Sequence, residues 1–116
     1  GEEDMGLPPG EPESRAPGVV TMAGLGMTVA DVTPALRKRF RLAASQGALV
    51  VGVDRGGPAD QAGVRVGDVV VRSGQEAITG AASLDKVNGW YRQADVVPLL
   101  LQRGRQQLFV SPRKGR

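Results

Sequence analysis

Glycine is the feature that most limits what this chain can fold into. The sequence holds 17 glycines and 8 prolines in 116 residues, and they divide its apolar stretches into short runs. Because these residues mark turns and interrupt helices, the pattern favours short strands over long helices. Aromatic residues make up 3% of the chain, so the core must be built mainly from aliphatic side chains. The length fits one domain with a single core.

Composition divides the chain into three parts. Residues 1–18 are rich in Pro, Gly and Glu and have no apolar periodicity, so we expect a disordered linker or leader there. Residues 19–112 carry the apolar runs of a folded domain. Residues 113–116 form a basic C-terminal tail. The net charge is +3, with the acidic residues concentrated at the N-terminal end; scattered Lys and Arg in the remainder favour a solvated surface.

The order of the predicted elements indicates an α+β domain. Thr33 followed by Pro34 predicts a helix over residues 34–40, because threonine caps free backbone N–H groups and proline fits the first turn. Ser83 begins the longest helical pattern. We expect strands at 27–30, 48–54, 68–72, 77–78 and on both sides of Gly104-Arg105, and one helical turn from Pro58 to Gly63. The sheet should curl into a partly open barrel or sandwich of five to six short strands with two to three short helices.

The residues needed for most hydrolytic chemistry are missing. The chain has no His and no Cys, so a Ser-His-Asp triad, a Cys-His pair and a zinc finger each lack a required part. Ser73, Ser83 and Ser111 therefore have no base to activate them. Asp68 follows a glycine, where aspartate commonly bonds to its own turn, and we interpret it as structural. We predict a domain with no catalytic residue, metal or cofactor of its own.

Two segments carry a family resemblance. Gly47 to Ile78 reads GALVVGVDRGGPADQAGVRVGDVVVRSGQEAI, and Leu25 to Leu42 reads LGMTVADVTPALRKRFRL. A glycine loop, a strand, a Pro-Ala turn and a Gly-Asp-Val-Val run in this order resemble the PDZ domains of bacterial HtrA/Deg (Do-like) serine proteases. The resemblance extends over about residues 19–112 and implies a PDZ-like fold. One departure is Arg41, which stands where the family usually has glycine.

The resemblance also implies a peptide site. PDZ-like domains add an extended peptide to a sheet edge, so that main-chain hydrogen bonds give affinity and pockets for alternate side chains give selectivity. The implied edge strand is Met27 to Asp31, and the loop before it would hold a terminal carboxylate with backbone N–H groups. The implied carboxylate-binding loop is Gly24, Leu25, Gly26 and Met27, and the implied groove residues are Thr28, Val29, Val87, Trp90 and Tyr91.

Each of these residues also has a purely structural interpretation. Gly24 and Gly26 fit a tight turn, and Met27 and Val29 fit a core. Trp90 fits a cap over the core whose indole edge is wet. The joint order of the motifs favours the functional interpretation for the loop and the strand, and leaves Trp90 open.

Three functions are compatible with the sequence. The first is a peptide-binding module that takes unfolded or C-terminal segments and serves a serine endopeptidase domain of the full-length chain, in the periplasm and without membrane insertion. The second is a subunit-assembly module that contacts neighbouring subunits and whose groove is closed, unused or filled by the protein's own residues. The third and least favoured is a basic nucleic-acid-binding domain, which would bind with strong salt dependence.

Overall fold

The computed structural model describes residues 18–91 and 93–114. Residues 1–17 of the linker predicted at 1–18, and the last two residues of the predicted tail, 115–116, lie outside the described residues. The described part contains seven strands and three helices. They are β2 (Val19–Met22), β3 (Met27–Asp31), α1 (Pro34–Phe40), β4 (Ala48–Val53), α2 (Pro58–Gln61), β5 (Val69–Ser73), β6 (Glu76–Ala77), α3 (Ala81–Trp90), β7 (Leu99–Arg103) and β8 (Gln106–Val110). The α+β class is confirmed, with one strand more than expected.

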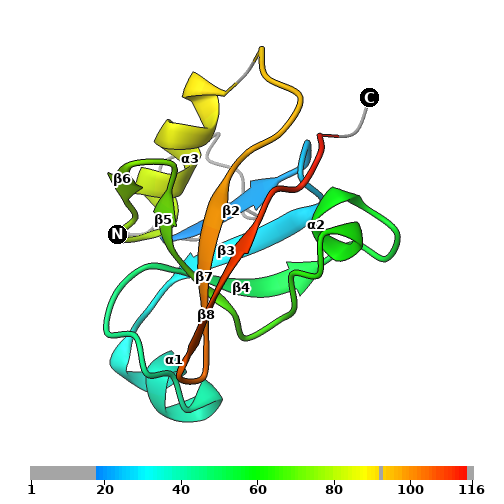
Figure 1. The fold of residues 1–116 in the computed structure, drawn as a ribbon. Coiled ribbons are helices and arrows are strands. Elements are labelled where there is room, and N and C mark those ends of the chain that lie inside the picture. Colours follow the sequence, from blue (N-terminus) through cyan, green and yellow to red (C-terminus); the bar gives the residue numbers. More distant parts are fainter. Residues whose placement is uncertain (1–17, 92, 115–116) are drawn as a thin grey trace, which may run out of the picture.

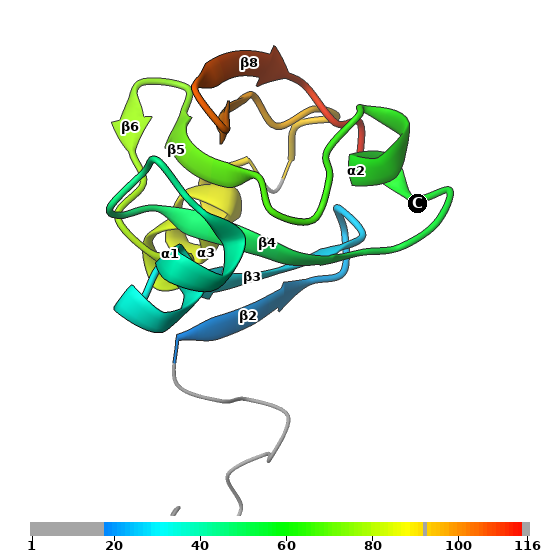
Figure 2. The same ribbon diagram turned by 90° about the horizontal axis from the view of Figure 1, so that it is seen from below.

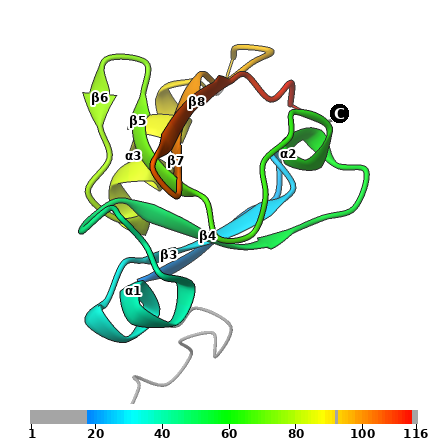
Figure 3. The same cartoon turned by 60° about the horizontal axis from the view of Figure 1, so that its bottom comes forward.

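The strands form a single curled antiparallel sheet. Their order is β2-β3-β4-β5-β7-β8, and β6 pairs with β5. In Figures 2 and 3 the β7–β8 hairpin lies across the molecule from β3 and β4, as predicted for a partly open barrel. Figure 2 shows α1 and α2 near opposite ends of β4, while α3 packs against β2. The sheet therefore begins at β2, beside α3, and ends at β8.

Helix α1 begins and ends at the predicted residues. Thr33 Oγ1 accepts a hydrogen bond from the N–H of Leu36 at 3.1 Å, so threonine is the N-cap. Arg41 ends the helix in the left-handed conformation, with φ 56° and ψ 51°. A glycine would adopt this conformation without a Cβ penalty, so the chain leaves α1 along the path expected of the family's glycine and Arg41 bears the strain. The basic residues of α1, Arg37, Lys38 and Arg39, are exposed, in line with the solvated surface that the scattered charges favoured.

Helix α3 begins two residues earlier than predicted. Ser83 lies inside its first turn, and Ser83 Oγ accepts hydrogen bonds from the N–H groups of Thr79 and Gly80 at 2.9 and 3.1 Å. A serine that satisfies these free donors from the third helical position caps the helix from within. The apolar spacing alone did not predict this cap, so the start of the helix was placed at Ser83 itself.

The core is aliphatic, as the composition indicated. One buried cluster joins residues from β2, β3, β4, β5, β7, α2 and α3, among them Met27, Val29 and Leu84. Met27 and Val29 are both buried in this cluster, and their part in a peptide groove stays a prediction. Within residues 18–91 and 93–114, no helix has the length and apolar character needed to cross a membrane.

A partly buried ion pair joins Asp68, just before β5, to Arg103 on the neighbouring strand β7. Asp68 accepts hydrogen bonds from Arg103 Nε and Nη2, each at 2.8 Å, and from the N–H of Arg65 at 2.9 Å. Arg103 Nη2 also donates to the carbonyl oxygen of Gly63 at 2.7 Å. The hydrogen bond to Asp68 raises the pKa of the Arg103 guanidinium above its ordinary value. Asp68 thus bonds to its own turn, as predicted, and Arg103 connects β7 to this turn and to Gly63, which follows α2.

Replacing Arg103 by Met should destabilise the fold. The Asp68 side chain is 2% exposed and the Arg103 side chain 30%, so the substitution leaves a buried carboxylate without its bidentate partner. We expect a loss of about 3 kcal/mol in the free energy of unfolding, measured by urea denaturation. Arg105→Met, the same change at an exposed position two residues away, should alter stability by less than about 0.5 kcal/mol. Equal losses in both variants would contradict a stabilising role for the pair.

Candidate functional site

A four-residue loop, Ala23 to Gly26, joins β2 to β3. The N–H groups of Leu25 and Gly26 both donate to the carbonyl oxygen of Met22, at 3.1 and 2.9 Å. Gly26 permits this turn because its φ is 69°, and a Cβ at this position would lie 3.3 Å from Pro58 Cδ. Two adjacent N–H groups of the implied carboxylate loop therefore converge on one oxygen. That oxygen belongs to the chain itself.

The strand implied to be an open edge is paired on both sides. β4 pairs with one edge of β3, and β2 pairs with the other. The register of β2 against β3 is Val19↔Ala30, Val20↔Val29, Thr21↔Thr28 and Met22↔Met27. The implied free edge at Met27–Asp31 is therefore wrong for this structure, because two β-prone runs joined by four residues form a hairpin. β2 lies between β3 and α3 (Figure 1), where the resemblance places a peptide.

The side chains of β2 alternate between the core and solvent. Met22 is 3% exposed and belongs to the buried cluster that also contains Leu25 and Met27, and half-buried Val20 packs against that cluster. Thr21 is exposed, and its Oγ1 accepts a hydrogen bond from Thr28 Oγ1 at 3.4 Å. β2 therefore presents two apolar side chains inward at alternate positions, as an extended ligand of such a groove would.

Asp31, the last residue of β3, bonds to the start of α3 and to the residue before β2. These bonds lie at the end of the groove remote from the loop. Its Oδ1 accepts a hydrogen bond from the N–H of Ala81, the first residue of α3, at 2.8 Å. Its own N–H donates to the carbonyl oxygen of Gly18 at 2.7 Å. A Cβ at Gly18 or at Gly80 would lie 2.7 Å from an Asp31 carboxylate oxygen, so both glycines leave room for this carboxylate. Asp31 thereby fixes the start of α3 relative to β3.

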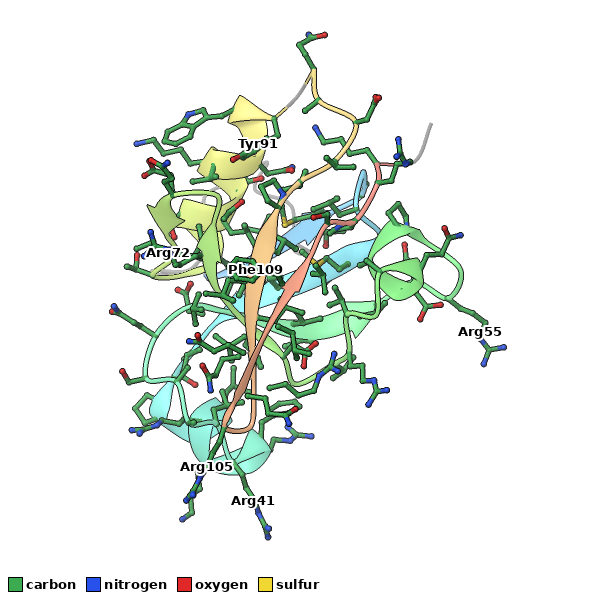
Figure 4. The ribbon with its side chains drawn as sticks, in the orientation of Figure 1. Arg41, Arg55, Arg72, Tyr91, Arg105 and Phe109 are labelled. Atoms are coloured by element: carbon green, nitrogen blue, oxygen red, sulfur yellow. The ribbon has the colours of Figure 1, made fainter. Side chains whose placement is uncertain are left out.

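The implied groove residues on α3 lie in different surroundings. Val87 is buried in the core cluster, with Ala81 and Leu84 from the same helix. A Cβ on Gly74 would lie 2.5 Å from the Tyr91 hydroxyl, so Tyr91 lies against the β5–β6 turn; Figure 4 shows it at the end of α3. Trp90 is 60% exposed, so it does not cap the core. The structure thus brings Val87 together with the loop and β3 residues, while contact of Trp90 and Tyr91 with a peptide remains a prediction.

An open hollow lies beside the loop. Its volume is about 360 Å³, and it is lined by Gly24, Asp85, Asn88, Gly89 and Lys114. A Cβ on Gly24 would have no other atom within 4 Å. Within the described part of the chain, the buried Asn88 Oδ1 has no hydrogen-bond partner. The hollow leaves space for the loop to change its conformation.

Comparison with known proteins identifies the arrangement. A family model described as "PDZ domain" matches residues 20–111. This chain belongs to the PDZ domain family. The match falls within the domain predicted at residues 19–112, and the predicted PDZ-like fold is confirmed.

Relatives of this PDZ domain include HtrA-type proteases. A "probable periplasmic serine endoprotease DegP-like" of Ectopseudomonas mendocina (strain ymp) is 37% identical over 99 residues, which cover 84% of this chain and 21% of that protein. The structure titled "HtrA-type protease AlgW with decapeptide" has a TM-score of 0.65 and 31% identity, covering 78% of this chain and 28% of that one. The HtrA3 PDZ domain bound to a phage-derived ligand (FGRWV) has a TM-score of 0.65 and 21% identity, covering 78% and 83%. The resemblance to HtrA/Deg proteases is confirmed, and this PDZ domain spans about a fifth of its curated relative.

Two contributions to the groove were missed in the sequence. Val20 and Met22 fill it, and the signal was the short connection between the run that contains them and the next β-prone run. Asp31 anchors α3 across 50 residues of sequence, and no local pattern reports a bond of that separation.

Removing the Asp31 carboxylate should loosen the start of α3 in this PDZ domain. Asp31→Ala deletes the acceptor for the Ala81 N–H, and we expect a loss of about 1 kcal/mol in the free energy of unfolding. Asp31→Asn keeps an acceptor oxygen and is the matched control, with less than half of that loss because only the charge near the helix start is removed. Chemical denaturation measures both. A loss for Asn as large as that for Ala would show that the hydrogen bond to Ala81 contributes nothing.

Proposed function

We propose that this PDZ domain is the non-catalytic peptide-recognition module of an HtrA-type serine endopeptidase that works in the periplasm. The relatives support this context, because they are named periplasmic serine endoproteases. The lack of His and Cys supports a module without its own catalytic centre. Its partners would be unfolded or C-terminal peptide segments and a protease domain of the full-length chain.

The observation that carries this proposal is the extended strand already seated between β3 and α3. β2 pairs with β3 along its length and directs Val20 and Met22 inward, so the space accommodates one strand with apolar residues at alternate positions. A peptide in this place would add to β3 by the same main-chain hydrogen bonds. Its terminal carboxylate would replace the Met22 carbonyl oxygen as acceptor for the N–H groups of Leu25 and Gly26.

A second candidate, subunit assembly, is favoured by two observations. The groove is filled by the chain's own residues, as expected of an assembly module. Phe109 on the edge strand β8 is 83% exposed. An exposed aromatic side chain on a sheet edge is typical of a protein contact. Sedimentation of wild type and Phe109→Gln over a concentration series tests this candidate, because only an assembly module should lose self-association with the phenyl ring.

Peptide recognition predicts a preference for a free carboxylate. The pentapeptide Gly-Val-Val-Thr-Met, which copies residues 18–22 and has apolar residues at its last and third positions, should bind this chain with a dissociation constant roughly in the micromolar range. Its amidated form should bind at least about tenfold more weakly, because charge-assisted hydrogen bonds to the Leu25 and Gly26 N–H groups are lost. Isothermal titration calorimetry with both forms measures the ratio.

The outcomes separate the two candidates. Equal affinity of acid and amide would contradict recognition of a terminal carboxylate. Peptides with varied last residues extend the test beyond one ligand. If none binds to the wild type or to a Val20→Asp variant, in which β2 is weakened, peptide recognition is refuted and assembly is favoured.

A further inference from the structure

The position of β2 leads to an inference about how the groove is regulated. We propose that residues 18–22 are a built-in ligand of the groove, and that a peptide binds only when this segment leaves β3. The inference rests on the proposed peptide-recognition function and adds to it an internal competitor.

The segment covers the whole length of β3. At the loop end, the Met22 carbonyl oxygen accepts the N–H groups of Leu25 and Gly26. At the other end, the Gly18 carbonyl oxygen accepts the Asp31 N–H at 2.7 Å. The four residue pairs of the β2–β3 ladder lie between these points. A peptide that adds to the same edge needs the same backbone donors and acceptors, so it and β2 exclude each other.

The inward side chains of β2 fill the space that a peptide's side chains require. Met22 is 3% exposed within the core cluster, and Val20 packs against the same cluster. The expected competitor is therefore an extended segment with an apolar last residue and a second apolar residue two positions earlier. The sequence Gly-Val-Val-Thr-Met, copied from residues 18–22, is therefore the probe, because it reproduces the segment that pairs with β3.

Several features make β2 displaceable. It is a four-residue strand at the end of the sheet, and Met22 is its one fully buried residue among two half-buried valines and an exposed threonine. The loop that follows has exposed Ala23 and Gly24, and Gly24 adjoins the hollow. Short edge elements with few buried contacts open more readily than the core strands to which they pair.

A reversible covalent lock tests the exclusion directly. Thr21 and Thr28 lie opposite each other with their hydroxyl oxygens 3.4 Å apart, so the double substitution Thr21→Cys/Thr28→Cys can form a disulfide across the two strands. The chain has no other cysteine. We expect fluorescein-labelled Gly-Val-Val-Thr-Met with a free carboxylate to bind the reduced protein. The oxidised protein should bind it at least about tenfold more weakly, as measured by fluorescence anisotropy.

A matched lock on another hairpin controls for oxidation itself. Gln102 and Gln107 are opposite each other on β7 and β8, with a side-chain hydrogen bond of 3.2 Å. Oxidation of Gln102→Cys/Gln107→Cys should leave peptide affinity unchanged, because the disulfide restrains the far end of the sheet.

A loosening variant should have the opposite effect. Val20→Asp places a carboxylate against the apolar cluster and should release β2, which raises the apparent affinity for the peptide by about tenfold. Gln106→Asp adds the same charge to an exposed residue of β8 and should bind like the wild type. If Val20→Asp does not fold, as judged by circular dichroism, the comparison of oxidised and reduced lock decides alone.

The results distinguish this inference from the function on which it rests. Equal peptide affinity of the oxidised and reduced lock overturns the inference, since a restrained β2 would then leave the peptide site open. Absence of binding in the wild type, the reduced lock and Val20→Asp overturns peptide recognition itself. Weaker binding on oxidation, together with tighter binding by Val20→Asp, supports both.

Discussion

β3 pairs with β4 on one edge and with β2 on the other, the edge beside α3. Whether the groove can take a peptide depends on which segment pairs with this second edge. Backbone N–H and C=O groups that are buried without partners cost about 1–3 kcal/mol each, and α3 partly covers this edge. The chain meets that requirement with its own residues, which pair along β3 up to the Met22 carbonyl oxygen. Any ligand of the groove must supply the same main-chain groups. Strand addition is therefore an exchange of one partner for another.

The width of the groove is set at the far end from the loop. Asp31 reaches across to the first N–H group of α3, and the missing side chains of Gly18 and Gly80 leave room for its carboxylate. This hydrogen bond holds the start of α3 at a fixed distance from β3. The space between α3 and β3 holds one extended strand, which is β2 in this structure. The anchor belongs to β3 and α3 and remains when β2 departs, so the groove stays formed for an entering peptide.

Local signals in the sequence predicted most helices and strands. They did not predict that β2 would take the edge of β3 that a peptide was expected to occupy. Thr33 and Pro34 located α1, and the Gly104-Arg105 turn located the closing hairpin, because capping and turn chemistry act over a few residues. The resemblance implied that the edge of β3 is free for a ligand, yet β2 of the same chain makes the hydrogen bonds that a ligand would make.

Trp90 shows a second limit of prediction from the sequence. It continues the three-residue spacing of Ala81, Leu84 and Val87, but each such step turns the side chain by about 60° away from the core, so nine residues carry it to the opposite face.

Whether β2 or a peptide occupies the edge of β3 depends on two free energies: the entropy cost of ordering the strand, and the gain from its hydrogen bonds and burial. Each ordered backbone residue costs about 1–2 kcal/mol, which is similar to the net return from a hydrogen bond and partial burial, so most of β2 is held only marginally. Met22 is the exception, because its release would expose a buried side chain and leave a gap among Leu25, Met27 and their neighbours in the cluster. A ligand restores that packing only if its own last residue is apolar. A ligand that displaces β2 must therefore also fill the place of Met22 in the core. A peptide that ends in a polar residue cannot do so.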